Sequence, residues 1–409
     1  MGASNELWLF TMNFPYGHGE AYLETELPLV AAGYERVVIL PLEGHGAARP
    51  LPANVEVQLL MPGALMYKPL PLGKVLTILP RFLQLWKAVA RTAPSPELLA
   101  ARRRELFSIL RQTFNRQQVL VQACGKRYDP DRVTLYSYWT SDWAGVLGCW
   151  RLADPRVQFV SRMHGFDLYA ERATDKWPLL QGFHVQQAKR IFVASQAGLD
   201  DLLARYPERS STFRLARLGT HDHGRGPWAA ADVLRIVSCS NLVPLKRVHL
   251  IAEALRHVGR PVQWTHFGDG AERKAVEAVV NTLPPDIDVE LMGSRPNHEV
   301  IAWYRTRPVD VFVHASSTEG GAPVALQEAA SFGIPLIGID AGGVREVVTG
   351  ESGILLAPDA GAVEIGNALR AFPGSVWHQE KAREQVRNFW RSRFDANAVY
   401  TAFLRDLRT

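Results

Sequence analysis

A glycine-rich segment around residues 316–328 contains the residue types best suited to chemistry. Apolar residues 309–314 predict a buried strand, residues 316–322 its loop, and Pro323 the first turn of a helix. Glycines let a backbone approach a ligand closely, and the amides and dipole of a helix start favour an anion such as phosphate. Glu328 lies about one turn into this helix, where a fixed carboxylate can accept hydrogen bonds from both hydroxyls of a ribose. A diphosphate together with a ribose indicates a nucleotide.

This segment also has a plainer interpretation. A doubly wound sheet contains several glycine-bearing loops between strands and helices, and Glu328 would then lie on a solvated helix face. The residues that follow favour the nucleotide. Residues 332–337 read as a helix end followed by another buried strand, and the pair Gly342 and Gly343 comes next.

On these residues the segment resembles the nucleotide-sugar site of the retaining glycosyltransferases of family 4, which have the GT-B fold. Two glutamates separated by seven residues are typical of that family, the first near the donor sugar and the second on the ribose. Eight residues lie between Glu319 and Glu328 here, so strict spacing would put Gly320 in the first role. The resemblance implies the ribose role for Glu328, the donor-sugar role for Glu319, and a donor-binding loop that includes Gly320 and Gly321.

A cation follows the predicted strand at residues 236–238. Residues 238–247 run from this strand through a loop into a helix, so Lys246 at the helix start would face the anion site. A fixed cation there stabilises the charge that develops on a departing nucleoside diphosphate. The family usually has an arginine at Asn241 and a lysine at Lys246; only the lysine matches, and Arg247 can compensate. The alternative is a helix-start lysine in solvent.

A Gly-x-Gly loop follows the first predicted strand. Gly17 and Gly19 permit residues 14–20 to approach a diphosphate or an acceptor, and the loop resembles the first glycine-rich turn of the family. Alone this motif is weak, because dinucleotide binding would need a third glycine. Capping of the predicted helix at residues 21–30 is an adequate explanation for the acidic residues near its start, which are Glu20, Glu24 and Glu26.

Residues 161–167 follow another strand at its carboxyl end, where ligands bind open sheets. His164 can donate to a sugar hydroxyl or carbonyl, and Asp167 can order the loop or meet the acceptor. A lone histidine is more often a core or surface residue, but the run His-Gly-Phe-Asp resembles the family and favours a catalytic role. Tyr138 and Trp139 end a neighbouring strand, where they would stack on an acceptor sugar or simply pack in the core.

No metal motif is recognisable. His221 and His223 flank Asp222, but no other ligand cluster of known spacing accompanies them, and the paired aspartates of metal-dependent sugar transferases are missing. We therefore expect catalysis without metal or another cofactor, with a nucleotide sugar as co-substrate. The turn at residues 266–270 resembles that of the family, and Gly268 there would be structural, with an indirect influence on the nucleotide.

Length and composition predict a folded protein of two domains. The chain has 409 residues, more than the roughly 250 to 300 at which single cores stop growing. Its hydrophobic content of 47% and charged content of 21% do not indicate disorder. The three cysteines fit neither zinc nor redox spacings, which indicates buried thiols in a reducing compartment. Without a signal-peptide pattern or a run of about 18 apolar residues, we predict a cytoplasmic protein.

Apolar strand-like runs alternate with helical patterns, which predicts parallel sheets. Residues 214–233 break this rhythm, so we predict domains over residues 1–213 and 214–390 with a linker at the junction. The resemblance implies an α/β protein with two Rossmann-like domains facing across a cleft, residues 391–409 forming a helix that crosses back to the first, acceptor-binding domain. The predicted strands are residues 7–11, 37–40, 133–136, 157–160, 191–194, 236–238, 262–267, 289–292, 311–314 and 336–339.

Positive charge gathers in residues 68–127, which contain twelve lysines or arginines against Glu97 and Glu105. The rest of the chain is net acidic, since the whole carries only +5. Apolar residues such as Phe82 and Trp86 recur at near-helical spacing, and a basic, apolar helix can lie on an anionic membrane. The alternative is an ordinary helix pair with solvated arginines. No recognised nucleic-acid motif accompanies the charge, which argues against nucleic-acid binding.

The resemblance as a whole implies a retaining glycosyltransferase. It would move a sugar from a nucleotide-sugar donor to a saccharide or lipid-linked saccharide, in cell-surface polysaccharide assembly at the inner face of the plasma membrane. Two alternatives remain: a nucleotide-sugar epimerase of the same fold, and a non-catalytic subunit that binds sugar nucleotides. Turnover with an acceptor distinguishes the three.

Overall fold

The computed structural model describes residues 5–17, 19–60 and 72–408. The described chain divides into two compact units. The first contains the residues up to Ala194, together with Gly198–Ala216 and the C-terminal residues from Tyr400. The second contains Ser195–Ala197 and Arg217–Val399. After residue 216 the chain enters the second unit at Arg217.

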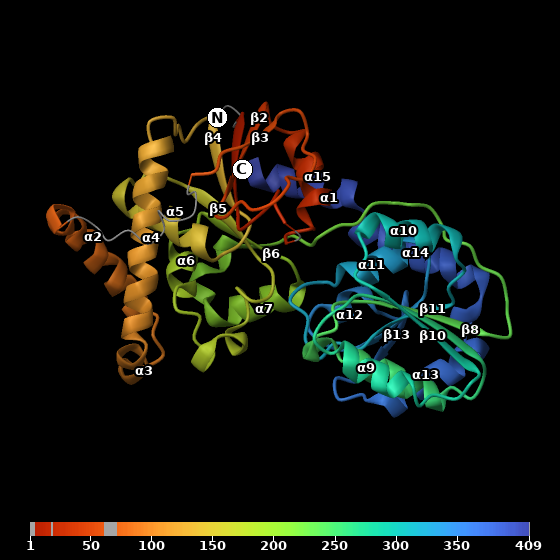
Figure 1. The fold of residues 1–409 in the computed structure, drawn as a ribbon. Coiled ribbons are helices and arrows are strands. Elements are labelled where there is room, and N and C mark those ends of the chain that lie inside the picture. The colour runs from red at the N-terminus through yellow and green to blue at the C-terminus, as the bar shows by residue number, and fades with distance from the viewer. Residues whose placement is uncertain (1–4, 18, 61–71, 409) are drawn as a thin grey trace. The chain divides into compact units, whose positions relative to one another are not determined.

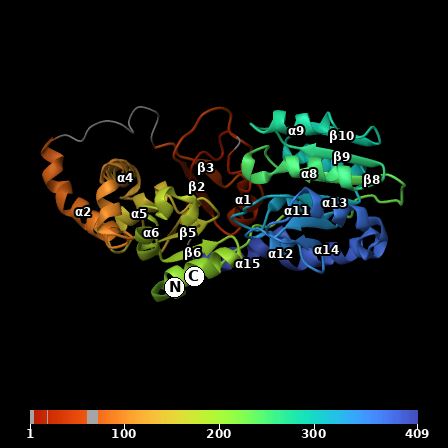
Figure 2. The same ribbon diagram turned by 90° about the horizontal axis from the view of Figure 1, so that it is seen from below.

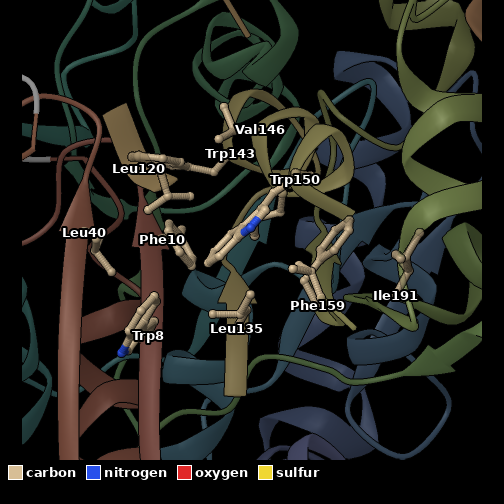
Figure 3. Packing of buried hydrophobic residues seen from close by; sticks show 14 of the residues in the cluster. Trp8, Phe10, Leu40, Leu120, Leu135, Trp143, Val146, Trp150, Phe159 and Ile191 are labelled. Atoms are coloured by element: carbon tan, nitrogen blue, oxygen red, sulfur yellow. The ribbon is translucent and has the colours of Figure 1, made fainter. Parts of the chain in front are cut away.

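The first unit is built on a seven-stranded parallel sheet of order β3-β2-β1-β4-β5-β6-β7 (Figure 1). Its core consists of the apolar residues of the strands and of the helices that cover them, and Figure 3 shows Trp8, Phe10 and Leu135 packing against Trp143 and Trp150. The strands are β1 Glu6–Thr11, β2 Arg36–Pro41, β3 Val55–Val57, β4 Val133–Ser137, β5 Phe159–Met163, β6 Arg190–Val193 and β7 Phe213–Leu215.

The helices of the first unit include a long pair, α2 and α4, that lie side by side (Figures 1 and 2). Phe82 of α2 packs edge-on against Phe107 of α4, with ring centroids 5.3 Å apart. The C-terminal helix α15 returns to this unit, where the Phe403 ring packs against Tyr136 and Phe192. The helices are α1 Leu23–Ala31, α2 Leu72–Ala90, α3 Pro96–Ala101, α4 Arg103–Cys124, α5 Asp142–Ala153, α6 Gln181–Gln187, α7 Gln196–Arg205 and α15 Ala396–Arg408.

The second unit has a six-stranded parallel sheet of order β10-β9-β8-β11-β12-β13. Its strands are β8 Leu234–Cys239, β9 Val262–Phe267, β10 Ile287–Gly293, β11 Val311–His314, β12 Leu336–Ile339 and β13 Gly353–Leu356. Its helices are α8 Val248–Ala254, α9 Arg273–Val280, α10 Asn297–Thr306, α11 Val324–Ser331, α12 Val344–Val347, α13 Ala362–Ala371 and α14 Glu380–Phe394. Two apolar clusters form its core, one of which contains Trp264 and the other Phe312.

The predicted fold class is confirmed, since both units are parallel α/β sheets and the C-terminal helix packs on the first. All ten predicted strands form, although β5 begins two residues later than expected. Three strands were not predicted, namely β3, β7 and β13. Each has only three or four residues and lies at the edge of its sheet, where a short strand buries too little apolar surface to leave a periodic signal.

Candidate functional site

Four loops of the second unit gather at the carboxyl edge of its sheet, after the neighbouring strands β9, β8, β11 and β12. Glycines bring the last two loops into backbone contact. Gly342 has φ +54°, and a Cβ there would lie 2.1 Å from the Glu319 carbonyl oxygen. A Cβ at Gly343 would lie 2.2 Å from the Gly321 carbonyl oxygen. The predicted donor loop with Gly320 and Gly321 is therefore held at a fixed place by the glycine pair that follows β12.

Gly268 likewise allows close backbone contact, here between the loops after β8 and β9. It has φ +139°, and a Cβ would lie 1.9 Å from the Ser240 carbonyl oxygen. Gly270, with φ +155°, approaches the Leu242 carbonyl oxygen in the same way. Gly268 thus supports the loop that leads to Lys246.

Lys246, Glu319 and His314 form a hydrogen-bonded cluster in this region. The Lys246 ammonium donates to Oε1 of Glu319 at 2.5 Å, and the same oxygen lies 2.8 Å from Nε2 of His314. Burial alone would raise the pKa of Glu319, but the bond from His314 and the ammonium of Lys246 outweigh it and hold the pKa at about 2. Glu319 is therefore ionised at neutral pH, and it orients the lysine.

Glu328 lies on α11 and is partly buried. Its Oε1 accepts a hydrogen bond of 2.7 Å from the side-chain amide of Asn297, at the start of α10. Burial raises the pKa of Glu328 to about 7, although the bond from Asn297 acts to lower it. Additional hydrogen-bond donors would stabilise the ionised form of such a poorly solvated carboxylate, and the two hydroxyls of a ribose are donors of this kind.

The two residues named as a second cation site differ in surroundings. Asn241 is exposed. Arg247 has a left-handed backbone with φ +48°, and its guanidinium donates to the Ala315 carbonyl oxygen at 2.9 Å. Arg247 thus joins the start of α8 to the loop after β11, and its charge lies beside that loop.

In the first unit, Glu20 holds the loop after β1. Its carboxylate accepts bonds of 2.9, 2.8 and 2.7 Å from the amides of Met12, Asn13 and Phe14, and one of 2.7 Å from the indole of Trp139. The capping interpretation of Glu20 is wrong, because α1 begins only at Leu23 and the carboxylate is turned back to the loop. This network joins the ends of β1 and β4, between which the strand order reverses.

Glu26 also has a role other than capping. It is buried, pairs with Arg162 and accepts a bond of 3.0 Å from the Tyr136 hydroxyl. Glu24 is exposed in the first turn of α1, as expected, and pairs with Arg49 at 2.9 Å. Arg49 donates to the carbonyl oxygens of both glycines of the Gly-x-Gly motif, Gly17 and Gly19, and so fixes that loop. Residue 18 lies outside the described residues.

His164 lies at the end of β5 and is 8% exposed. Its Nε2 lies 3.3 Å from the Tyr138 carbonyl oxygen, and its ring packs on Trp139 at 4.5 Å. Burial and the nearby guanidinium of Arg162 lower the pKa of His164 well below its ordinary value. The imidazole is therefore neutral at physiological pH and suited to hydrogen bonding with a sugar hydroxyl.

Asp167 acts on its own loop. Its carboxylate accepts bonds from the amides of His164 at 2.8 Å, Gly165 at 3.2 Å and Thr140 at 3.0 Å. Burial raises its pKa to about 6 despite these bonds. Asp167 therefore fits the loop-ordering role better than direct acceptor contact. Tyr138 is completely buried and packs in the core, whereas Trp139 is partly exposed.

Three polar residues of this region were not singled out from the sequence for these roles: His314, Asn297 and Glu346. His314 ends a buried strand, which is a recognisable signal, whereas nothing local marks Asn297. Glu346 accepts bonds of 2.6 Å from the Gln196 amide and from the guanidinium of Arg217, and Ser195 donates to the Gly320 carbonyl oxygen at 3.1 Å. These contacts fix the loop of Gly320 to the residues at which the chain changes unit.

Within the described ranges, no three His, Cys, Asp or Glu side chains come together as a metal site would require. His223 lies 3.2 Å from the guanidinium of Arg305 instead. Nor does any helix of the described chain combine the length and apolarity needed to cross a membrane.

Comparisons with known proteins agree with this architecture. Residues 234–372 match the family model described as glycosyl transferases group 1. WcaL of Escherichia coli, assigned to colanic acid biosynthesis as a glycosyltransferase, is 29% identical over 150 residues, 35% of this chain and 37% of that protein. The GDP-mannose-dependent alpha-mannosyltransferase of Mycobacterium tuberculosis is 26% identical over 272 residues, 63% of this chain and 66% of that protein. The matched segments thus span less than two thirds of these relatives.

Two solved structures resemble the whole chain. HepE of Anabaena in complex with UDP has a TM-score of 0.66 at 16% identity, and the match covers 98% of this chain and 99% of that one. Sucrose-phosphate synthase of Thermosynechococcus elongatus has a TM-score of 0.69 at 17% identity, covering 99% and 98%. At such identities the likeness concerns the fold alone. With its two parallel Rossmann-like sheets the chain has the GT-B fold, and its residues 234–372 are similar to the group 1 glycosyltransferases.

Proposed function

We propose that this protein is a metal-independent retaining glycosyltransferase that moves a sugar from a nucleotide-sugar donor to a saccharide or lipid-linked saccharide in cell-surface polysaccharide assembly. The observation that carries the proposal is the Lys246–Glu319–His314 cluster at the carboxyl edge of the second sheet. The names of relatives support the pathway class, since WcaL is assigned to colanic acid biosynthesis and AmsK of Erwinia amylovora to amylovoran biosynthesis.

Each part of the donor has a matching group in the second unit. The diphosphate would lie at the start of α11, where amide groups and the helix dipole favour an anion, within reach of Lys246. The ribose would meet Glu328, whose carboxylate gains two donors there. Glu319 would hold the lysine toward the phosphate, because His314 also binds the Oε1 atom that accepts from the lysine and so fixes the ionised carboxylate.

The reaction needs no nucleophile from the protein. The bond between the anomeric carbon and the phosphate oxygen breaks, the acceptor hydroxyl oxygen bonds to that carbon on the same face, and its proton passes to the departing phosphate. Lys246 stabilises the negative charge of the leaving group. In the first unit, neutral His164 and partly exposed Trp139 would orient the acceptor sugar by a hydrogen bond and by stacking.

A donor screen tests this proposal. The purified chain is incubated with UDP-, GDP- and ADP-sugars and a membrane extract as acceptor source, and release of nucleoside diphosphate is measured with and without EDTA. We expect release with one donor class, dependent on acceptor and unaffected by the chelator. Conversion of the donor to an epimer without acceptor would establish the epimerase instead. Activity lost with EDTA and restored by manganese would contradict metal independence.

Donor binding should depend on pH through Glu328. Because its pKa is about 7 in the free protein, the carboxylate is ionised at pH 8 and mostly protonated at pH 6. Only the ionised form accepts hydrogen bonds from both ribose hydroxyls, so the dissociation constant for nucleoside diphosphate should rise about tenfold from pH 8 to pH 6. Calorimetric titration at both pH values measures this change.

Two variants control this measurement. Glu328→Gln should reduce the dependence on pH to the part that comes from the ligand's own terminal phosphate, whose second pKa is about 6. It should also weaken binding at pH 8 by about 1.5–3 kcal/mol, as expected for lost hydrogen bonds to a charged group. Glu384→Gln, at an exposed glutamate of α14, should leave the wild-type profile unchanged. An equally steep profile in Glu328→Gln would remove this residue from the ribose site.

The basic segment adds a membrane contact to the proposal. Its apolar stripe packs on its own unit, with Leu85, Val89, Leu106 and Leu110 buried, as the alternative interpretation required. A second face of α2 and α4 remains exposed, and we call it the α2–α4 surface. It comprises Leu79, Arg81, Leu83, Lys87, Arg103, Arg104, Phe107 and Arg111. Lys68 lies outside the described residues.

The chemistry of the α2–α4 surface fits an anionic bilayer. Leu79, Leu83 and Phe107 are 46%, 47% and 54% exposed, so apolar side chains lie between the positive charges. No acidic residue occurs in the sequence of α2, and Glu105 of α4 is bound to Arg102. Each basic residue near an anionic surface contributes about 1 kcal/mol, so four such residues would hold the protein reversibly.

Co-sedimentation with liposomes tests this contact. The wild type should bind vesicles containing anionic phosphatidylglycerol at low salt and leave them at high salt, because the attraction decays within a Debye length. Arg103→Glu/Arg104→Glu should abolish binding. Arg102 must be kept, because it donates to the carbonyl oxygens of Thr174 and Trp177 and belongs to the fold. The control is Lys274→Glu/Lys381→Glu, which makes the same change of charge at two exposed lysines. If the arginine variant binds the vesicles as well as this control does, Arg103 and Arg104 do not contact the membrane.

A further inference from the structure

A pocket of about 360 Å³ opens in the first unit, between α4, the start of α5 and the segment that leads into α6. The three helices lie side by side in both views (Figures 1 and 2). Its walls are mainly apolar and include Ile109, Phe166, Trp177, Leu179 and Leu180. The volume falls in the range typical of sites for small ligands, and the pocket is too large and too polar at its base to be a packing defect.

The base of the pocket contains polar groups without partners among the described residues. Neither ring nitrogen of His184 has a partner in full hydrogen-bond geometry, although the Thr140 backbone lies close enough to act on the ring, and the side chain is 3% exposed. The Ser141 hydroxyl at the start of α5 is buried and has no such partner either. Buried polar atoms of this kind lose free energy unless a ligand or solvent satisfies them. Two such groups among the lining residues therefore indicate a partner that both donates and accepts hydrogen bonds.

The two arginines that line the pocket are each paired with a carboxylate of the lining. Arg102 makes two bonds of 2.9 Å to Glu105, and Arg116 pairs with Asp142. The carboxylate of Asp142 acts to raise the pKa of His184, but burial outweighs it and lowers the pKa to about 4, so the imidazole is neutral. A phosphate or carboxylate would find no surplus positive charge here, and a purely apolar chain would leave the polar base unsatisfied.

The pocket also continues toward the residues that the proposed function assigns to the acceptor. Phe166, which lines it, is 56% exposed and packs against Trp139 with ring centroids 5.0 Å apart. The Asp167 carboxylate fixes the amides of His164 and Thr140, so the loop of the acceptor residues and the pocket wall form one hydrogen-bonded structure. An oligosaccharide acceptor with one sugar unit at Trp139 would extend past Phe166, so that its next sugar unit reaches the pocket.

From these features we infer that the pocket binds an uncharged sugar unit of the acceptor, next to the unit that receives the transferred sugar. Hydroxyls would bond to His184 and Ser141, and the apolar face of the ring would pack on the aromatic wall. This inference rests on the proposed function for its role, but the sugar site itself can be tested without catalysis.

Saturation-transfer NMR on the full chain without donor tests the site. The probes are glucose, galactose, mannose, maltose, cellobiose and lactose, with n-octanol as the apolar probe. Inorganic phosphate, the anionic probe, has no carbon-bound proton and is followed by broadening of its phosphorus resonance. We expect transfer to at least one saccharide. Ala173→Trp, at a partly exposed position of the pocket wall, should abolish it, and Ala47→Trp, at an exposed loop, should not. His184→Leu should weaken the dissociation constant about three- to tenfold, and His184→Gln less.

The outcomes separate this inference from the proposed function. Binding of nucleoside diphosphate by the same samples reports on the second unit alone. Donor binding without any saccharide transfer would overturn the pocket assignment and leave the glycosyltransferase intact. Saccharide transfer that survives Ala173→Trp would place the sugar elsewhere and also overturn it. Transfer to n-octanol alone, or broadening of the phosphate resonance alone, if lost in Ala173→Trp, would replace the sugar by a lipid chain or an anion.

Discussion

Replacement of Lys246 by alanine should lower turnover of the nucleotide sugar by about 10²–10³-fold while changing donor affinity much less. The ammonium lies at the carboxyl edge of the sheet and is directed by an ionised glutamate, an arrangement that costs no reorganisation during the reaction. Charge on the diphosphate grows as the glycosyl bond breaks, so the cation acts most strongly in the transition state. Initial rates of diphosphate release and calorimetric donor titration measure the two quantities.

The controls for Lys246→Ala separate electrostatics from structure. Lys274→Ala removes an exposed lysine of α9 in the same unit and should leave both quantities unchanged. Glu319→Gln keeps the shape of the cluster but removes the charge that orients Lys246, so it should lower turnover by a smaller factor. Equal losses of turnover and donor affinity in Lys246→Ala would mean that the lysine only positions the substrate.

Arg162→Met should lower the thermal midpoint of the chain by about 6–20 °C, which corresponds to 3–5 kcal/mol for a buried charge left without its partner. Arg162 and Glu26 are 0% and 1% exposed, and the guanidinium lies 4.4 Å from the Phe403 ring centroid of the C-terminal helix. Burial raises the pKa of Glu26, and Arg162 opposes that rise. Without the arginine, Glu26 must be buried as a lone charge or protonated.

A double variant distinguishes this cause from a packing defect. Glu26→Leu/Arg162→Met removes both charges and should recover more than half of the lost midpoint, because two apolar side chains can replace a buried pair. Arg156→Met removes an exposed arginine paired with Asp154 and should leave the midpoint almost unchanged. Scanning calorimetry of the full chain measures all three. If the double variant is as unstable as Arg162→Met, the lower midpoint comes from lost packing and not from an unpaired charge.

Much of the fold could be predicted from local sequence, because apolar strands and glycine loops carry their own signals. A parallel strand buried on both faces reads as a short apolar run, and ten such runs became strands. The carboxyl ends of neighbouring parallel strands share one edge of a sheet. Lys246 and Glu319, each just beyond a strand end, could therefore be assigned to one site although 73 residues separate them.

The short edge strands could not be predicted, and neither could several polar roles. Glu20, Glu24 and Glu26 look alike at the start of a helix, yet one caps a loop, one pairs on the surface and one is buried with Arg162. Arg102 and Arg103 are neighbours in a basic run, but only Arg102 is held by carbonyl oxygens from another part of the chain. A side chain's partner depends on the direction it takes and on what folds against it, and periodicity contains neither.

The sequence by itself therefore determined the class of fold, the edge of each sheet at which chemistry would occur, and the residue types available there. These follow from backbone propensity and burial, which act over a few residues at a time. The tertiary structure decided which charges pair, that His314 and Asn297 join the site, and that His184 lies unsatisfied in a pocket. Such pairings join residues far apart along the chain, and only the packed fold brings their atoms within bonding distance.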